Sequence, residues 1–362
     1  MSSQDDGTAT ETPSGEDTHV NVADGIDHQV AMVMDLNKCI GCQTCTIACK
    51  SLWTEDGGSE YMYWNNVETK PGEGYPRGWE ESGGGWQSEE HSERQPGEIP
   101  SQEDYGRAWE FNHEAIMYEG GDQPLRPREG AEWGPNWDED EGAGEYPNSY
   151  YFYLPRICNH CTHPSCVEAC PRSAIYKREE DGIVLVDQER CRGYRYCVEG
   201  CPYKKVYYNT VSKKSEKCIF CYPRIEGDGP DGETFAPACA EECPPQLRLV
   251  GFLDDEDGPI YKLVEEYEVA LPLHAEFQTQ PNVYYIPPYA PPQHTEDGES
   301  VDVDRIPRQY LRDLFGGGVD QALDTIERER QKTRQGGDSE LMEILQDKNP
   351  AEQYRLEVFE DE

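Results

Sequence analysis

The sequence has few apolar residues and no long apolar run. Only 35% of its 362 residues are hydrophobic, and the mean hydropathy is −0.88. No stretch of about 20 apolar residues occurs, so we expect no segment that spans a membrane by itself. The N-terminal segment, MSSQDDGTATETPSGEDTH, contains neither a basic region nor an apolar core and is no secretion signal. We therefore expect a chain that stays inside or leaves the cell folded, carried by a partner.

Basic residues, lysine above all, are also scarce. There are 32 Lys and Arg residues against 73 Asp and Glu residues, which gives a net charge of −41, and only 12 of the basic residues are lysines. Such a surface repels phosphate backbones, which argues against a nucleic-acid-binding protein. Two interpretations remain, a protein that works in concentrated salt or a low-salt protein with a basic partner. The acids are spread along the whole chain, which favours concentrated salt.

Cysteine, in contrast, is abundant. All 15 cysteines fall into four groups: Cys39, Cys42, Cys45 and Cys49; Cys158, Cys161, Cys166 and Cys170; Cys191, Cys197 and Cys201; and Cys218, Cys221, Cys239 and Cys243. An odd number of cysteines argues against a disulfide framework. The fourth group alone would suit a zinc ribbon. The crowding in the other three groups favours clusters that contain several irons.

The two middle groups have the cysteine spacing of bacterial ferredoxins, with a proline after the last cysteine of each. In two-cluster ferredoxins the fourth cysteine of each group ligates the other cluster. Pairing the second group with the third, and the first with the fourth, predicts four ligand sets. We name them set I (Cys39, Cys42, Cys45, Cys243), set II (Cys49, Cys218, Cys221, Cys239), set III (Cys158, Cys161, Cys166, Cys201) and set IV (Cys170, Cys191, Cys197).

Set IV has three thiols because Tyr194 stands where the spacing calls for a fourth cysteine. A phenol replaces a thiolate poorly, so set IV suits a [3Fe–4S] cluster. Three [4Fe–4S] clusters with four thiols each and one cluster with three account for all 15 cysteines. His160 and His163 flank cysteines of the second group, but the complete thiol count leaves no position for a histidine ligand.

The predicted fold class is α+β, with two ferredoxin-like modules, a loop-rich insertion and a partly helical C-terminal tail. Strands are expected at 28–39 and 247–255, a hairpin at 173–191, with Asp181-Gly182 as the turn, and a hairpin or extended pair at 204–218. Helices are expected at 307–315, 319–334 and 339–345, after an extended segment at 272–297. The predicted boundaries are 1–27 (disordered acidic tail), 28–50 and 216–255 (module I), 51–150 (insertion, partner docking), 151–215 (module II) and 256–362 (tail, partner contact).

Two features have more than one interpretation. Five of the 12 lysines lie between 204 and 217: Lys204, Lys205, Lys213, Lys214 and Lys217. They either balance the charge of anionic clusters, which we favour, or contact an acidic partner surface. The aromatic residues of the insertion either pack locally or form a docking surface.

The sequence has no nucleotide-binding glycine fingerprint, no Walker motif and no supported nucleophile–base pair. Every cysteine is assigned to cluster chemistry. A chain with four redox centres and no substrate site is expected to pass electrons between other subunits.

Several stretches resemble the beta subunit of respiratory nitrate reductase. They are the four cysteine groups, WNNVETKPGEGYPRGWE (64–80), GPNW (134–137), AIYKREEDGIVLVDQERCRG (174–193) and SEKCIFCYPRIE (215–226). In that family an aromatic residue at the position of Tyr194 accompanies a [3Fe–4S] cluster. The resemblance covers roughly 28–255, and the acidic, lysine-poor composition suggests a haloarchaeal member.

The resemblance implies an electron-transfer subunit of a quinol-type nitrate reductase in anaerobic respiration. Its partners would be a membrane cytochrome that oxidises quinol and a molybdopterin catalytic subunit that reduces nitrate to nitrite. Set I would lie nearest the catalytic subunit and set IV nearest the membrane. The complex would be attached to the membrane through its partners, on the outer face after co-export with the catalytic subunit, or alternatively on the cytoplasmic face.

Two alternatives remain open at the level of sequence. Dimethyl-sulfide and ethylbenzene dehydrogenases and chlorate and selenate reductases have beta subunits with the same pattern. A free-standing polyferredoxin carrier is a different class of protein, but it would need neither the insertion nor the long tail.

Overall fold

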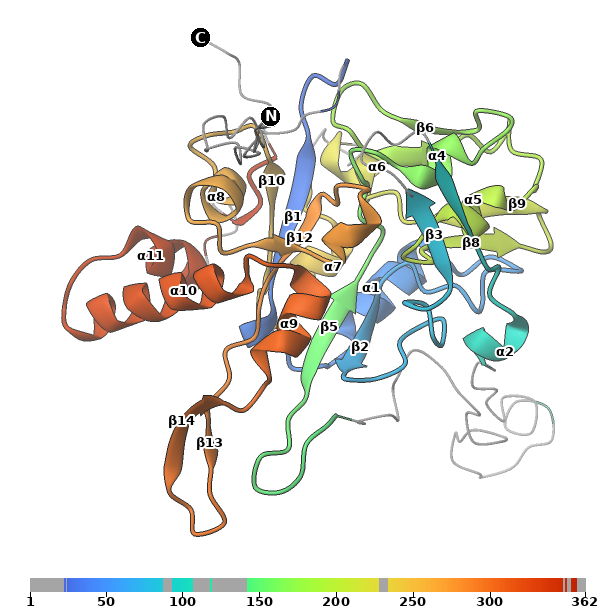
Figure 1. The fold of residues 1–362 in the computed structure, drawn as a ribbon. Helices are drawn as coiled ribbons and strands as arrows, with labels where there is room; N and C mark the ends of the chain where they lie inside the picture. Colours follow the sequence, from blue (N-terminus) through green and yellow to red (C-terminus); the bar gives the residue numbers. More distant parts are fainter. Residues whose placement is uncertain are drawn as a thin grey trace, which may run out of the picture.

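The structure, a computed structural model, describes residues 23, 25–86, 93–106, 118, 142–227, 234–347, 349 and 353–356. The disorder expected for 1–27 falls almost wholly outside these residues. The GPNW stretch and much of the insertion also lie outside them. The described chain mixes helices and strands, as predicted (Figure 1).

A four-stranded sheet lies at the centre, in the order β10-β1-β12-β11. Strand β1 (Val30–Asp35) is buried along its whole length, because VAMVMD is a nearly continuous apolar run of the kind that fills central strands. It pairs antiparallel with β10 (Arg248–Phe252) and parallel with β12 (Val283–Ile286). The strands expected near 28–39 and 247–255 are therefore confirmed.

The extended segment at 272–297 has a more specific role than the sequence indicated. Strand β12 and the short antiparallel β11 (Leu271–Pro272) come from this part of the chain and complete the central sheet. A parallel partner carries no local turn signal, which is why the sequence could not identify it. The predicted domain boundaries stay a prediction, although the expected tail supplies two strands of the core.

Short elements surround the cysteine groups. Strand β5 (Phe152–Arg156) leads into the second group, and the helices are α1 (Thr44–Trp53), α4 (Ser165–Glu168), α5 (Tyr196–Gly200), α6 (Tyr222–Ile225) and α7 (Ala238–Glu241). The hairpins are β6 (Ile175–Lys177) with β7 (Val184–Val186), and β8 (Val206–Asn209) with β9 (Lys214–Lys217). Both predicted hairpins are confirmed, and in the first Gly182 has the positive φ of 67° that the predicted turn requires.

The described part of the insertion is sparse in regular structure, as expected, yet it packs into the core. Strand β2 (Asn66–Lys70) pairs with β5, β3 (Gly83–Trp86) pairs with β4 (Arg94–Gly97), and α2 spans Gln102–Tyr105. Trp79 is fully buried, and the Arg156 guanidinium lies 3.5 Å from its ring centroid. Local packing therefore accounts for the buried aromatic residues of this segment.

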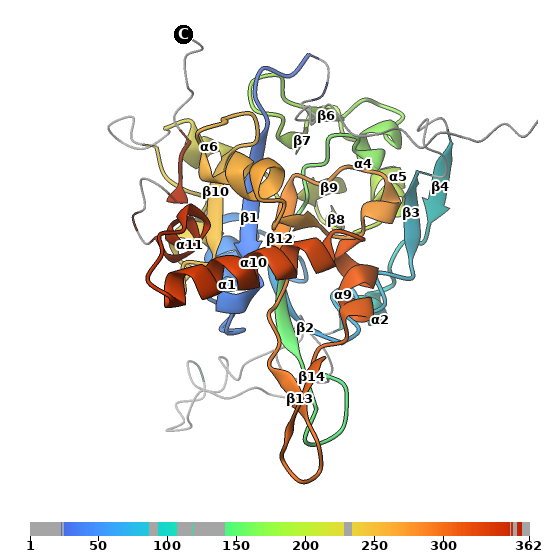
Figure 2. The same ribbon diagram turned by 60° about the vertical axis from the view of Figure 1, so that its left-hand side comes forward.

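The C-terminal part begins with α8 (Pro259–Tyr261), a π-helical turn (Lys262–Glu266) and a 3-10 turn (Ala275–Phe277). Helices α9 (Arg308–Phe315), α10 (Val319–Arg334) and α11 (Glu340–Gln346) confirm the three predicted helices. They lie on one side of the central sheet, and α4, α5 and the two hairpins lie on the other (Figures 1 and 2). The hairpin of β13 (Pro292–His294) and β14 (Ser300–Asp304) projects from the body in both views.

Candidate metal centres

Three of the four predicted ligand sets each line a cavity of their own. The thiols of set II share one cavity, those of set III share another, and those of set IV share a third with Tyr194. Segments separated by up to about 190 residues in the chain meet at set II, because α1 packs against α7. The structure therefore brings these predicted partners together, while their role as ligands stays a prediction.

Set I is assembled at the edge of the molecule. Cys243 lies close enough to Cys42 and Cys45 for these thiols to raise its pKa, after the larger effect of burial. Cys39 is half-buried and Cys42 is exposed, whereas the set II thiols are all buried. All 15 cysteines are free thiols.

The four sets follow one another through the molecule. Cys239 of set II lies within electrostatic reach of Cys45 of set I. Burial raises the pKa of Cys218 to about 12, and the thiol that adds most to the rise is Cys158 of set III. Sets III and IV both draw thiols from the α4 and α5 segments. The order is therefore I, II, III and IV.

Burial makes the thiols weak acids in the absence of metal. It raises the pKa of Cys39, Cys161 and Cys218 to about 12 and that of Cys197 to about 11. Thiolate is the form that binds metal, so these sites need the positive charge of iron to lose their protons. Among the described residues, no three His, Cys, Asp or Glu side chains converge closely enough to hold a single metal ion. The thiols of sets II, III and IV stand around cavities, an arrangement that fits a multi-iron cluster.

Polar atoms without partners test whether the cavities fit an anionic group. Trp64 Nε1 borders the set II cavity, and His160 Nε2 and Ser165 Oγ border that of set III; all three are buried without a hydrogen-bond partner. The Nε of Arg248, beside sets I and II, is also unpartnered. Each of these atoms can donate, and an unsatisfied buried donor is costly. Sulfide and thiolate acceptors of an iron–sulfur cluster would fit them.

His160 illustrates why the donors point to this chemistry. Its Nδ1 accepts a hydrogen bond of 3.0 Å from the Val184 backbone N–H. Burial, followed by the nearby Lys217 and Lys177, holds its pKa well below the usual value, so the ring is neutral. The proton of a neutral ring with an accepting Nδ1 lies on Nε2. His160 is therefore a donor beside set III, and the expectation that it is no ligand stays a prediction.

The lysine-rich stretch is mostly internal. Lys204, Lys205 and Lys217 are at most 1% exposed, and within the described chain none has a carboxylate within 4 Å. Their ammonium groups donate to backbone carbonyls, such as Glu199 O at 2.9 Å from Lys204 and Cys218 O at 2.7 Å from Lys217. A buried unpaired cation is costly, so these residues support the charge-balance interpretation.

Several donors contact the cysteine sulfurs directly. Trp53 Nε1 donates to Cys221 Sγ at 3.2 Å, and Arg248 Nη1 donates to Cys239 Sγ at 3.2 Å. The backbone N–H of Ser215 donates to Cys191 Sγ at 3.4 Å. Such bonds remove electron density from the sulfur and thereby tune a cluster's potential. Neither Trp53 nor Arg248 could be predicted from the cysteine motifs, since neither belongs to one.

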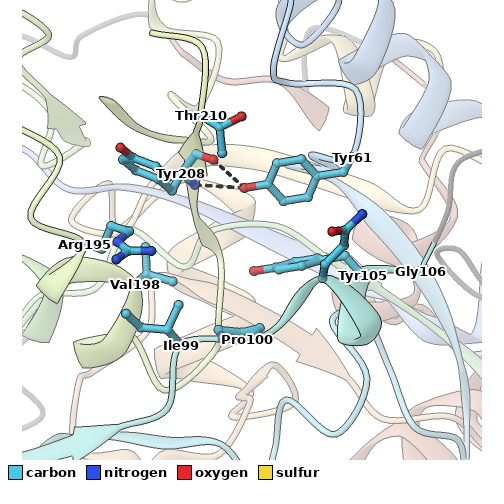
Figure 3. A pocket seen from close by; sticks show the side chains of 10 residues that line it. Tyr61, Ile99, Pro100, Tyr105, Gly106, Arg195, Val198, Tyr208 and Thr210 are labelled. Carbon is cyan, nitrogen blue, oxygen red and sulfur yellow. Dashed lines mark hydrogen bonds between the residues drawn. The ribbon is translucent and has the colours of Figure 1, made fainter. Parts of the chain in front are cut away.

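A larger pocket lies beside α5, away from the thiols. It is lined by Tyr61, Tyr105 and Tyr208, with Arg195 and Val198 from the α5 segment (Figure 3). The Tyr61 hydroxyl donates to Tyr208 O at 2.6 Å and accepts from Tyr208 N at 3.1 Å. The pocket wall therefore ties the insertion to the β8–β9 hairpin next to set IV.

Together, the thiol sets, the unpartnered donors and the buried cations define an iron–sulfur protein. Residues 149–253 match the family model described as a 4Fe-4S dicluster domain. The chain is 80% identical over 95% of its length to the respiratory nitrate reductase subunit beta of Haloferax mediterranei, of which 97% is covered. It is 57% identical to the dimethylsulfide dehydrogenase subunit beta of Rhodovulum sulfidophilum, covering 91% of this chain and 99% of that one.

A third relative, respiratory nitrate reductase 1 beta chain of Escherichia coli, is 37% identical, with 81% of this chain and 77% of the relative covered. The chain therefore belongs to the family of respiratory nitrate reductase beta subunits, which are iron–sulfur electron-transfer subunits of oxidoreductase complexes. No helix in the described residues is both long and apolar enough to cross a bilayer.

Proposed function

We propose that this chain conducts electrons through three [4Fe–4S] clusters, at sets I, II and III, and one [3Fe–4S] cluster, at set IV. One observation carries the proposal: all 15 cysteines fall into four neighbouring sets that run in the order I to IV. The clusters, when bound, supply one-electron redox centres. The chain's own residues hold them, exclude water from them and supply donors and cations around them.

Tyr194 supports three irons at set IV. It lines the cavity with Cys170, Cys191 and Cys197, where a fourth thiol would otherwise stand. Its side chain is 57% exposed and stacks on Tyr196 with ring centroids 6.5 Å apart. A phenol held outward in this way leaves one corner of the site without a thiolate.

The two ends of the series support two docking faces. At set I, Cys42 is exposed and has the exposed apolar side chains of Ile40 and Ile47 near it in the chain. At set IV, Tyr194 and Tyr196 are exposed. Exposed apolar and aromatic groups favour protein contacts.

We assign a molybdopterin catalytic subunit to the set I face and a quinol-oxidising membrane cytochrome to the set IV face. The pocket beside α5 would then lie under the cytochrome. The reaction at the catalytic subunit would be nitrate with two electrons and two protons giving nitrite and water. The choice of nitrate as the substrate of the complex is supported by the 80% identity between this chain and a respiratory nitrate reductase subunit beta. Attachment to the membrane through the partners, on its outer face, belongs to the same proposal.

The arrangement of the sets also supports two ferredoxin-like modules. Module II would contain sets III and IV with the β6–β7 hairpin, and module I would contain sets I and II with β1 and β10. The first and fourth cysteine groups meet across the α1–α7 contact, as an interrupted module requires.

The test is made on the native complex. A tag on this chain captures the complex in concentrated salt, and oxidation of reduced viologen by nitrate is measured. Nitrate activity with a co-purified molybdenum subunit supports the proposal. A molybdenum subunit without nitrate activity would favour a sister enzyme, such as the dimethylsulfide dehydrogenase to whose beta subunit the chain is 57% identical. Recovery of the chain alone would favour a free carrier.

A second measurement addresses the cluster types. EPR of the oxidised complex should show a [3Fe–4S] signal, and Tyr194→Cys should convert that signal toward a cubane. Spectra of the wild-type complex that contain cubane signals alone would overturn the assignment at Tyr194.

A further inference from the structure

Arg248 is a charged residue at the start of an otherwise apolar central strand. It begins β10, pairs with Met34 of β1 and is fully buried. Its Nη1 donates to Cys239 Sγ of set II at 3.2 Å. Its charge also acts on Cys39, Cys45 and Cys243, which are three of the four thiols of set I. The guanidinium therefore lies between the two sets.

The protein holds this cation rigidly and leaves its charge uncompensated. Nη2 donates to Asn65 Oδ1 at 2.7 Å, and Asn65 Nδ2 donates in turn to Thr46 Oγ1 at 3.3 Å. The Nε has no partner, and in the described part of the chain no carboxylate lies within 4 Å of the guanidinium. Nη1 also donates to Met32 Sδ at 3.6 Å. Met32 and Asn65 are neutral, so the countercharge of Arg248 must come from the thiolate sites.

We propose that Arg248 raises the reduction potentials of the centres at sets I and II together. The proposal rests on the proposed function, because it requires clusters at both sets. One-electron reduction adds one negative charge to a centre, and no proton is needed. A fixed cation in a medium of low dielectric constant stabilises the more negative form. The N–H···S bond to Cys239 acts in the same direction.

The two sets should respond unequally. Set II receives both the charge and the direct hydrogen bond, whereas the charge alone acts on set I. The hydrogen bonds of Arg248 go to Met32, Cys239 and Asn65 and to no thiol of set III or IV, so these two sets serve as internal references. Lowering the reduction potentials of sets I and II together would chiefly disfavour electron transfer from set III to set II.

The experiment is an EPR-monitored redox titration of the purified complex with Arg248→Gln. We expect the equilibrium constant for one-electron reduction to fall at least tenfold at set II, which is about 59 mV for a one-electron couple, and by less at set I. Sets III and IV should not shift. Arg355→Gln is the matched control, since Arg355 is half-exposed, pairs with Asp255 at 3.0 Å and follows the same strand edge. Intact clusters with unchanged potentials at sets I and II would overturn the proposal.

Two further variants keep the test decisive if Arg248→Gln loses clusters. Arg248→Lys retains the charge, so the equilibrium constant for one-electron reduction at set I should stay within threefold of the wild-type value. A tenfold fall of that constant would overturn the proposal. Asn65→Ala retains the guanidinium but removes the acceptor of Nη2, so the reduction potentials at both sets should fall by less than in Arg248→Gln. Unchanged potentials at both sets would count against the proposal. Failure of the proposed function looks different, because the wild-type complex would then lack the four cluster signals.

Discussion

The surface and the interior of this molecule have opposite charge. The chain carries 73 acidic residues against 32 basic ones, yet among the described residues the buried charged side chains are mostly cationic. Six buried side chains are Lys or Arg and three are Asp or Glu. The buried cations are Lys70, Arg156, Lys204, Lys205, Lys217 and Arg248.

The partners of these cations divide them into two kinds. Lys70 and Arg156 lie 3.7 and 3.2 Å from Glu68, so the protein supplies their countercharge. The other four have no carboxylate within 4 Å in the described residues, and they lie beside the thiol sets. The acidic surface is what the predicted concentrated salt would favour, whereas the cationic interior is what anionic cofactors would favour. Net charge alone would hide this difference.

The largest expected effect follows from removal of the cofactors. Protein refolded without iron would bury four cations without countercharge, at about 3–5 kcal/mol for each broken pair. We expect this apoprotein not to unfold cooperatively, as judged by circular dichroism on heating in concentrated salt. Reconstitution with iron and sulfide should restore a sharp transition. An apoprotein that melts like the native protein would show that the interior cations need no clusters.

A smaller effect is expected from Lys217→Met. In the cluster-loaded protein, loss of this cation should lower the free energy of unfolding by about 3 kcal/mol, because sets II and III lose a countercharge. An apoprotein without a cooperative transition has no defined free energy of unfolding, so the two forms of the apoprotein are compared by their circular dichroism signal. The same change should leave that signal unchanged or increase it, and this reversal of sign is the decisive readout. Lys213→Met is the control, since Lys213 lies on the same hairpin but is exposed; its effect should stay within about 0.5 kcal/mol. Equal losses in both forms would contradict the assignment.

His274 is a buried cationic site whose partners are the protein's own carboxylates. It hydrogen-bonds Glu276 and Glu80, both at 2.7 Å. Burial alone would lower the pKa of His274, but these two carboxylates raise it. Burial likewise opposes ionisation of Glu80, yet His274 and Lys70 lower the pKa of Glu80 to about 2.

The directions of these two pKa shifts determine how the contribution of this network to stability depends on pH. The His274 contribution is fully present below its unfolded pKa of about 6.5 and is lost as pH rises through the higher folded value. The Glu80 contribution is present above 4.5 and is lost as pH falls toward about 2. His274→Gln should therefore cost about 1 kcal/mol at pH 6 and less at pH 9, measured by denaturant unfolding. A cost that grows toward pH 9 would contradict the prediction.

Much of the cluster-bearing region could be predicted from the sequence, because cysteine spacing and turn residues are local signals. The hairpin turn at Asp181-Gly182 is an example, and outside this region apolar periodicity, which is also a local signal, predicted the three C-terminal helices. The residues that surround the sulfurs were not predictable in this way. Trp53 reaches Cys221 from 168 positions away, and contacts of that kind leave no mark in a motif.

The sequence also contains a signal of a buried charge in the central sheet. Arg248 interrupts the apolar run LRLVGF, and a lone charge in a buried strand indicates a specific partner. The lysines at 204–217 were recognised as a cluster, yet the sequence left open whether they faced inward. Burial depends on which face of β8–β9 meets the core, and that depends on long-range packing.

The smallest effect is expected at the surface. Asp297 lies in an exposed loop, and Asp297→Asn should change the free energy of unfolding by no more than about 0.5 kcal/mol. The sign should be stabilising in dilute buffer, since one charge is removed from a surface that repels itself. In about 1 M salt, where the screening length is roughly 3 Å, the effect should vanish. Lys217→Met should keep its full cost in the same salt series, because buried charges are screened far less. Denaturant titrations of both variants at each salt concentration separate the two regions, and a parallel salt dependence would mean that they share one electrostatic origin.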